Sequence, residues 1–193
     1  MASTFTLAAG PNTDIWKKPP STDVFTAPFR PHSSAPANTF ASTSITFTTT
    51  YTQQYDQAGL LLTLTNPSSP SARKWIKAGV EFYNGDARLS VVACDAWADW
   101  SVSTPRGAED IVAGTKPVTI SVVRESDEHG SSLWVYAVDG TDKTPLREIC
   151  WVLGEYADEG WQLEVSALVA RPGKETEGKL EAKFSDFDVQ WKK

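Results

Sequence analysis

Apolar and polar residues alternate with a period of two along most of the chain, and no stretch sustains the helical period of 3.6. Such alternation places successive side chains on opposite faces of an extended strand. Asn84 and Gly85 separate two alternating stretches and form the strongest two-residue hairpin signal. The stretches expected to form strands are 39–52, 58–65, 74–83, 87–95, 97–104, 118–125, 131–138, 145–153, 161–170 and 180–191.

About eleven strands joined by short turns predict a sandwich of two β-sheets. Residues 107–112 are expected to form one short helical turn. A length of 193 residues suits one domain, so residues 1–193 are expected to form a single β-sandwich. Eight of the twelve prolines precede residue 71, and residues 1–72 carry equal numbers of acidic and basic side chains. We therefore expect residues 1–38 to be a Pro-rich arm packed on the domain.

Charge and motif content exclude several classes of function. A formal net charge of −6 disfavours binding to nucleic acid or to an anionic membrane surface. No apolar run approaches the 18 residues of a transmembrane helix, and residues 1–10 lack the basic start of a signal peptide. The expected location is therefore cytoplasmic.

Phosphate-binding and dinucleotide-binding motifs are absent, and His32 and His129 lack partners at metal-ligand spacing. Neither a cofactor nor a metal is expected.

The chain has two cysteines, Cys94 and Cys150, each within an apolar alternating stretch. Two buried free thiols are the favoured interpretation, because a cytoplasmic protein of this size needs no disulfide. A disulfide between the two residues is the alternative.

Two predicted strands carry aromatic and charged residues on the face that should contact water. In 74–83 the apolar face holds Ile76, Ala78, Val80 and Phe82, and the opposite face holds Trp75, Lys77, Gly79, Glu81 and Tyr83. In 131–138 the corresponding outward residues include Trp134 and Tyr136. These aromatics either cover a sheet beneath the arm, or form a protein-binding face, or line a concave small-molecule or sugar site.

Glu81 and Glu148 lie on outward faces of different predicted strands, and they are the carboxylates considered as a hydrolytic pair. Solvated or ion-paired surface residues are the favoured interpretation of both. If the chain is an enzyme, Glu81 is the candidate general acid or base, and Lys77 would stabilise developing negative charge.

Several blocks together resemble a domain-of-unknown-function family whose yeast member is described as a regulator of enolase, and the N-terminal block resembles its fungal branch. The blocks are TDIWKKPP at 13–20, YDQAGL at 55–60, KWIKAGVEF at 74–82 with the following Asn84 and Gly85, and DWS at 99–101. The resemblance implies a concanavalin A-like jelly-roll sandwich of two antiparallel sheets with about 11–13 strands, related to lectins and glucanases. Its recurrent blocks map onto Asp56, Gln57, Trp75, Lys77, Glu81, Asp99 and Trp100.

The leading hypothesis is a binding or regulatory protein whose concave face takes a carbohydrate-like or small metabolite, or a metabolic enzyme such as enolase. The candidate ligand-binding residues are Gln57, Trp75, Lys77, Glu81, Tyr83, Asp99, Trp100, Trp134 and Tyr136. Replacing Trp75 with alanine is expected to abolish binding at a cost below about 2 kcal/mol. The alternative is a cofactor-independent isomerase, cyclase or glycan hydrolase that uses Glu81.

Overall fold

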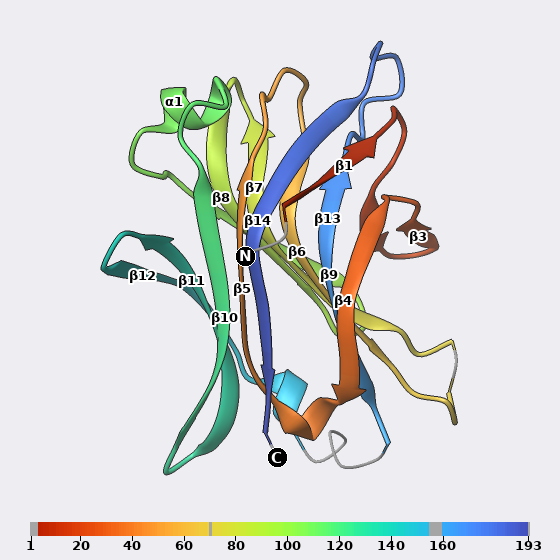
Figure 1. Ribbon diagram of the computed structural model, residues 1–193. Coiled ribbons are helices and arrows are strands. Elements are labelled where there is room, and N and C mark those ends of the chain that lie inside the picture. The colour runs from red at the N-terminus through yellow and green to blue at the C-terminus, as the bar shows by residue number, and fades with distance from the viewer. Residues whose placement is uncertain (1–3, 70, 155–159, 193) are drawn as a thin grey trace.

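A computed structural model describes residues 4–69, 71–154 and 160–192 (Figure 1). Two six-stranded antiparallel sheets pack face to face, which confirms the predicted sandwich. The first sheet has the order β1-β14-β5-β10-β11-β12 and the second has the order β4-β13-β6-β7-β8-β9. The strands of the first sheet are β1 (Phe5–Ala9), β5 (Phe40–Thr48), β10 (Val118–Asp127), β11 (Gly130–Asp139), β12 (Asp142–Ile149) and β14 (Leu180–Trp191). Those of the second are β4 (Phe29–Pro36), β6 (Gln57–Thr65), β7 (Lys74–Tyr83), β8 (Asp86–Cys94), β9 (Ala98–Ser103) and β13 (Gln162–Ala170).

The segment expected to be a Pro-rich arm contributes strands to both sheets. Strand β1 pairs with β14 at the edge of the first sheet, and β4 pairs with β13 at the edge of the second. Between them, β2 (Ile15–Lys18) and β3 (Thr22–Phe25) form a separate two-stranded hairpin. The described residues therefore hold fourteen strands rather than 11–13. Four of the fourteen, β1 to β4, lie outside the ten stretches predicted to form strands. They are short or rich in Pro and Ser, so their sequences carry little periodic signal.

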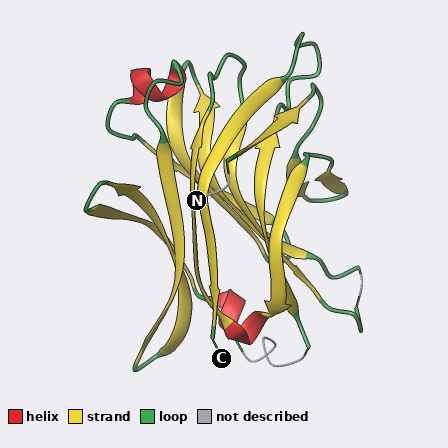
Figure 2. Cartoon of the chain, in the orientation of Figure 1, coloured by secondary structure: helices red, strands yellow, loops and turns green. Residues whose placement is uncertain are grey.

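Short helical turns lie at the two ends of the sandwich (Figure 2): α1 (Ala108–Val112), η1 (Ala37–Thr39) and η2 (Trp151–Leu153). The first confirms the helical turn expected at 107–112. The predicted hairpin between β7 and β8 is also confirmed, because Asn84 and Gly85 both have positive φ angles, 53° and 80°. Among the described residues, no helix has the length and apolar character needed to cross a membrane.

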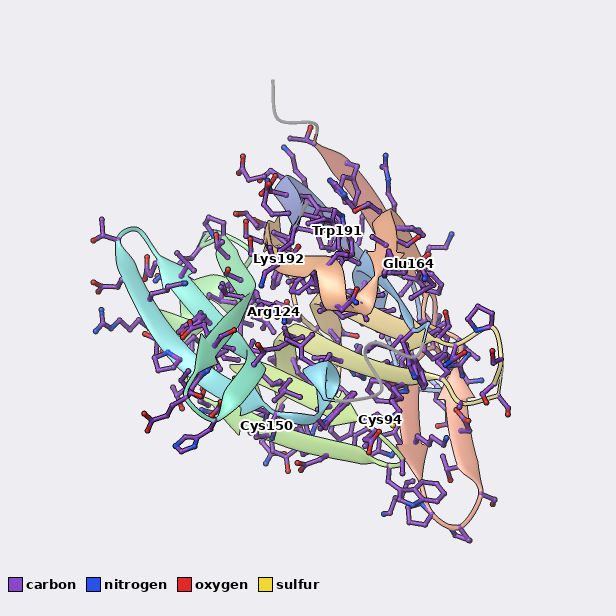
Figure 3. All side chains as sticks on the ribbon, turned by 90° about the horizontal axis from the view of Figure 1, so that it is seen from below. Cys94, Arg124, Cys150, Glu164, Trp191 and Lys192 are labelled. Atoms are coloured by element: carbon purple, nitrogen blue, oxygen red, sulfur yellow. The ribbon has the colours of Figure 1, made fainter. Side chains whose placement is uncertain are left out.

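The strand predicted over 145–153 is only partly correct. Strand β12 ends at Ile149, because Cys150 has a right-handed helical backbone (φ −80°, ψ −29°) that interrupts the alternation. Cys150 is consequently exposed rather than buried, whereas Cys94 is buried as predicted. Figure 3 labels both residues. Both cysteines are free, so the disulfide alternative is excluded.

The main hydrophobic core lies between the two sheets. It includes Phe40 and Phe47 of β5, Phe184 of β14 and Leu60 of β6, all at most 2% exposed. Ile45, Phe47 and Tyr51, which alternate within the predicted strand 39–52, all belong to this core. The shared parity of Ile45 and Phe47 directs both to one face of β5. Tyr51 reaches the core from the loop that follows, because β5 ends at Thr48 and is shorter than the predicted strand.

A second, smaller core lies on the opposite face of the second sheet, beneath the β2–β3 hairpin. Its buried members are Ile15, Ala27, Leu61, Trp75, Val92, Cys94, Leu168 and Ala170. Trp75 is 1% exposed and belongs to this core, which confirms for this residue the alternative that the aromatics cover a sheet beneath the arm. Its predicted position on an open ligand-binding face is wrong. The hairpin excludes water from the part of the face that Trp75 occupies.

Replacing Trp75 with alanine should lower the free energy of unfolding by about 3–5 kcal/mol, because the substitution empties a large site in the second core. Urea unfolding followed by circular dichroism measures the change. Trp97→Ala is the matched control: Trp97 is 43% exposed, and its loss should cost less than about 1 kcal/mol. Equal effects of the two substitutions would contradict the placement of Trp75.

Candidate functional site

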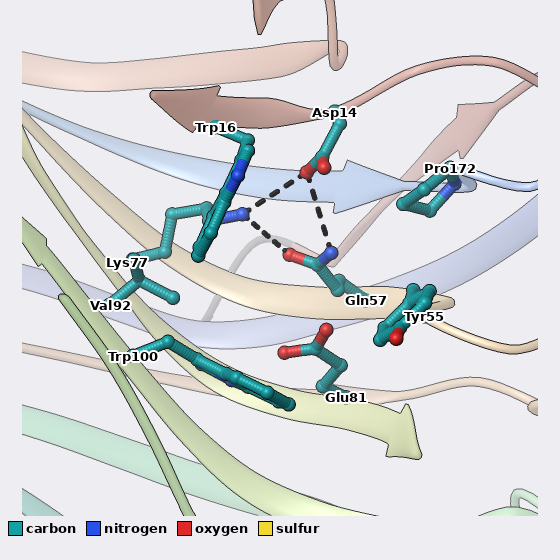
Figure 4. A pocket seen from close by; sticks show the side chains of 9 residues that line it. All are labelled: Asp14, Trp16, Tyr55, Gln57, Lys77, Glu81, Val92, Trp100 and Pro172. Atoms are coloured by element: carbon teal, nitrogen blue, oxygen red, sulfur yellow. Dashed lines mark hydrogen bonds and ion pairs between the residues drawn. The ribbon is translucent and has the colours of Figure 1, made fainter. Parts of the chain in front are cut away.

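A pocket of about 270 Å³ opens on the hairpin side of the second sheet (Figure 4). Adjacent strands supply its floor: the paired residues Gln57 and Glu81 come from β6 and β7, and the row Lys77, Val92 and Trp100 crosses β7, β8 and β9. All of these side chains share the parity that points away from the main core. The complete lining is Asp14, Trp16, Tyr55, Gln57, Lys77, Glu81, Val92, Trp100 and Pro172.

Lys77 is the centre of a polar cluster that ties the N-terminal segment to the sheet. Its Nζ donates to Asp14 Oδ1 at 3.2 Å and to Gln57 Oε1 at 2.9 Å. Gln57 Nε2 in turn donates to the same Asp14 oxygen at 3.5 Å. The Lys77 side chain is only 7% exposed, so this pairing offsets much of the cost of removing its charge from water.

Glu81 is a second buried ionisable group in the pocket, with 6% exposure. Burial raises the pKa of its carboxyl group, and the charge of Lys77 and the hydrogen bond from Ser90 only partly offset this effect. Ser90 Oγ donates to Glu81 Oε2 at 2.9 Å, and Trp100 Nε1 donates to Ser90 Oγ at 3.1 Å. The indole of Trp100 and the carboxylate of Glu81 are thus joined through one hydroxyl group.

Aromatic rings form the walls around these polar groups. Figure 4 shows Trp16 and Trp100 on opposite sides, with the amide of Gln57 and the carboxylate of Glu81 between them. Tyr55, from the loop between β5 and β6, completes the wall. Tyr83 does not line the pocket but supports it, because its ring packs edge-on against Trp100 at 5.0 Å and lies 5.8 Å from Tyr55.

Asp56 lies beside the pocket and has a structural role. It is fully buried and pairs with Arg171, whose Nε and Nη2 donate to Oδ1 at 2.9 Å and to Oδ2 at 2.8 Å. Asp56 Oδ2 also accepts the backbone N–H of Gln53 at 3.0 Å. This pair joins the loop that carries Tyr55 to the segment that carries Pro172, and so it holds one end of the pocket in place.

The structure brings together four of the nine predicted ligand-binding residues. Gln57, Lys77, Glu81 and Trp100 line the pocket. Tyr83 packs behind Trp100, as described above, and Trp75 belongs to the second core. The Asp99 side chain is 83% exposed, and its backbone carbonyl accepts a hydrogen bond from Arg147.

Trp134 and Tyr136 do not lie on the pocket face, which corrects the predicted platform. Both belong to β11 in the first sheet, where their rings stack at 6.1 Å. Glu148 is also in the first sheet and accepts a hydrogen bond from Ser132 at 2.7 Å, so it forms no pair with Glu81. Alternation assigns each residue to a face of its own strand, but it does not state which sheet contains that strand.

Sequence reasoning missed five lining residues: Asp14, Trp16, Tyr55, Val92 and Pro172. A signal existed for three of them, because Asp14, Trp16 and Tyr55 lie within the recognised blocks 13–20 and 55–60. Val92 and Pro172 carry no such signal. Within the described ranges, no group of three or more His, Cys, Asp or Glu side chains is arranged to hold a metal ion.

Replacing Asp56 with asparagine should lower the free energy of unfolding by about 3–5 kcal/mol, because Arg171 would keep a buried charge without its partner. Urea unfolding at neutral pH measures the loss. Asp142→Asn is the matched control, because it breaks an exposed ion pair between Asp142 (64% exposed) and Arg106 (81% exposed). It should change the free energy of unfolding by less than about 1 kcal/mol. A small effect of Asp56→Asn would show that the buried pair does not hold the loop.

Replacing Glu81 with glutamine should stabilise the protein at neutral pH. The folded-state pKa of Glu81 lies above the ordinary value of 4.5, so the ionised carboxylate destabilises the fold at pH values above that pKa. As the pH falls through the folded-state pKa and below 4.5, Glu81 becomes protonated in both states and the destabilisation disappears. The advantage of the variant should therefore be greatest near pH 7 and vanish towards pH 4.

Urea unfolding across this pH range provides the measurement. Glu148→Gln is the matched control, because Glu148 accepts a serine hydroxyl in the first sheet as Glu81 does in the second. A variant at Glu81 that is less stable than the wild type at neutral pH would contradict the stated effect of burial.

Comparison with known proteins adds family and fold to this geometry. Residues 1–191 match the family "Protein of unknown function (DUF1349)". An uncharacterized protein of Emericella nidulans is 38% identical over 187 residues, which cover 96% of this chain and 86% of that protein. A functionally unknown protein from Saccharomyces cerevisiae has a similar crystal structure, with a TM-score of 0.65, 20% identity, and coverage of 97% of this chain and 88% of that one.

A more distant structure extends the likeness to part of a larger enzyme. The bifunctional GH43-CE protein of Bacteroides eggerthii aligns with 97% of this chain at a TM-score of 0.57 and 13% identity. Only 22% of that protein is covered, so the likeness concerns one part of it and shows the fold alone. The fold is the concanavalin A-like jelly-roll sandwich that the family resemblance implied.

Proposed function

The chain belongs to the DUF1349 family of proteins of unknown function, and we propose that it binds a small carbohydrate-like ligand in the pocket beneath its N-terminal hairpin. The observation that carries the proposal is the arrangement of Trp16 and Trp100 around the buried polar groups Gln57 and Glu81. Flat apolar rings match the C–H faces of a sugar, and a few fixed polar groups match its hydroxyls.

The size of the pocket limits the ligand. A volume of about 270 Å³ lies at the lower end of the range of roughly 300–1,000 Å³ usual for small-molecule sites. One sugar ring or a metabolite of similar size is the expected occupant. The name of the Bacteroides eggerthii protein refers to a glycoside hydrolase family, and this supports a sugar ligand only through the shared fold.

Thermal unfolding with glucose, xylose or mannose in excess tests the proposal. A ligand at 100 times its Kd adds about 2.7 kcal/mol of stability and raises Tm by several degrees in a protein of this size. Trp100→Ala should abolish the shift, because it removes one wall of the pocket together with the hydrogen bond to Ser90. Trp134→Ala, on the first sheet, should retain it.

The outcomes separate binding in the pocket from binding elsewhere. A shift that disappears in Trp100→Ala and persists in Trp134→Ala supports the proposal. A shift that survives Trp100→Ala would place the ligand at another site. If none of the three sugars raises Tm, the proposal that the ligand is carbohydrate-like is overturned.

Glu81 favours a second candidate, a cofactor-independent enzyme acting in the same pocket. A buried carboxyl whose pKa is raised by burial holds its proton more readily than an ordinary glutamate, which suits it to a role as general acid or base. Lys77 is less suited to stabilise developing charge, because Asp14 and Gln57 already accept its hydrogen bonds. Turnover of a bound sugar that stops in Glu81→Gln while binding persists would favour the enzyme.

The enolase partner and the cytoplasmic location expected from the sequence stay predictions. A partner enzyme would contact an extended surface, typically about 800 Å² on each protein, and not only a small pocket. Unfolding in the presence of purified enolase, with Trp100→Ala alongside, separates such a surface from the pocket: a stabilisation that persists in the variant would indicate a contact outside it.

A further inference from the structure

The charges that line the pocket do not cancel. Asp14, Lys77 and Glu81 are its charged residues, and with Glu81 ionised they sum to −1. Asp14 and Lys77 form an ion pair at 3.2 Å and largely neutralise each other. Within the described part of the chain, the negative charge left without a close ionic partner is therefore that of Glu81.

Lys77 is the main positive charge that acts on Glu81, but among the described residues no cation is in ion-pair contact with its carboxylate. Ser90 donates one neutral hydrogen bond to Oε2, and the indole of Trp100 contributes more weakly. Lys77 lies on the same strand, but its hydrogen bonds to Asp14 and Gln57 direct its ammonium group towards the hairpin. Arg88 lies opposite Glu81 in the register of β7 and β8. Its guanidinium group, however, contacts Thr104 at 2.6 Å and Asp86 at 3.3 Å.

The walls of the pocket are also suited to a cation. Trp16, Tyr55 and Trp100 surround the space next to Glu81 (Figure 4). The face of an aromatic ring attracts a cation, most strongly for tryptophan, and the attraction increases when water is excluded. A buried carboxylate bordered by such rings therefore complements a positively charged group better than a neutral hydroxyl.

We infer that the ligand of this pocket carries a protonated primary amine, which binds Glu81 between Trp16 and Trp100. This inference rests on the proposed function and specifies its ligand class. The pocket volume restricts the ligand to about one ring. An amino sugar and a small aliphatic amino alcohol are the two classes of compound of this size that we consider as carriers of the amine. Both would bring an ammonium group that can pair with Glu81 directly, whereas that of Lys77 is paired with Asp14.

Two matched pairs of probes test the inference. Glucosamine differs from glucose, and ethanolamine from ethylene glycol, by one amino group in place of a hydroxyl. Titrations are followed through the indole N–H signals in two-dimensional ¹H–¹⁵N NMR spectra, with the signals of Trp16 and Trp100 assigned by their phenylalanine variants. We expect the amine of at least one pair to bind at least tenfold more tightly than its neutral partner.

Glu81→Gln should remove most of this preference, because it keeps the shape of the side chain and an acceptor for Ser90 but loses the charge. Glu148→Gln, in the first sheet, should leave the preference intact. The pair that shows the preference identifies the source: glucosamine alone indicates an amino sugar, and ethanolamine alone indicates a small amino alcohol.

The remaining outcomes separate this inference from the proposed function. If the amine and its neutral partner bind equally in both pairs, the amine inference is overturned, and equal binding of glucosamine and glucose at Trp16 and Trp100 leaves the carbohydrate-like ligand standing. A preference that survives Glu81→Gln overturns the assignment to Glu81. If neither the probes nor the three sugars perturb these two indole signals, the proposed function itself is overturned.

Discussion

The central strands of the second sheet are buried on both faces, and the position of the pocket depends on this constraint. In β6, Leu60 and Leu62 belong to the main core, whereas the intervening Leu61 belongs to the second core. In β7, Ile76 belongs to the main core and the adjacent Trp75 belongs to the second core. A sheet with apolar side chains on both faces needs a cover on each, and the β2–β3 hairpin supplies the outer one.

The hairpin covers only part of that outer face. The pocket lies next to the apolar contacts of the hairpin, where polar contacts between the hairpin segment and the sheet begin. The apolar residues of the hairpin pack near Trp75, whereas its preceding loop places Asp14 against Lys77 and Gln57. These polar contacts satisfy groups that the hairpin shields from water. Glu81 lies beyond Lys77 on the same strand, where burial continues but ionic pairing is weaker. The site thus combines the charge of Lys77, which is paired with Asp14, with the charge of Glu81, which forms no ion pair among the described residues.

Family and fold constrain the function of this chain less than the side chains of the pocket do. The yeast protein of similar structure is itself functionally unknown, and the bacterial enzyme shares only the fold. The residues above the sheet therefore carry the functional argument. Trp16, Trp100 and Glu81 define a small aromatic site with a net negative charge, and that composition, rather than the jelly roll, supports the proposed ligand class.

The sequence by itself determined the sandwich class, the β7–β8 hairpin and much of the polar content of the pocket. Period-two alternation directs Lys77 and Glu81 to the same face of one strand, and Asn84 and Gly85 accept the positive φ angles of a tight turn. Gln57 and Trp100 were identified through family blocks, without any indication of how their strands pair.

Which residues share the site depends on how distant strands pair and pack. Alternation is a property of a single strand, so it placed Trp75 and Trp134 equally on an outward face. Long-range pairing then separated them: Trp134 lies in the other sheet, and Trp75 lies beneath a hairpin from about sixty residues earlier in the chain. The same hairpin brings Asp14 and Trp16 over the sheet, a contact set by packing between distant segments rather than by local pattern.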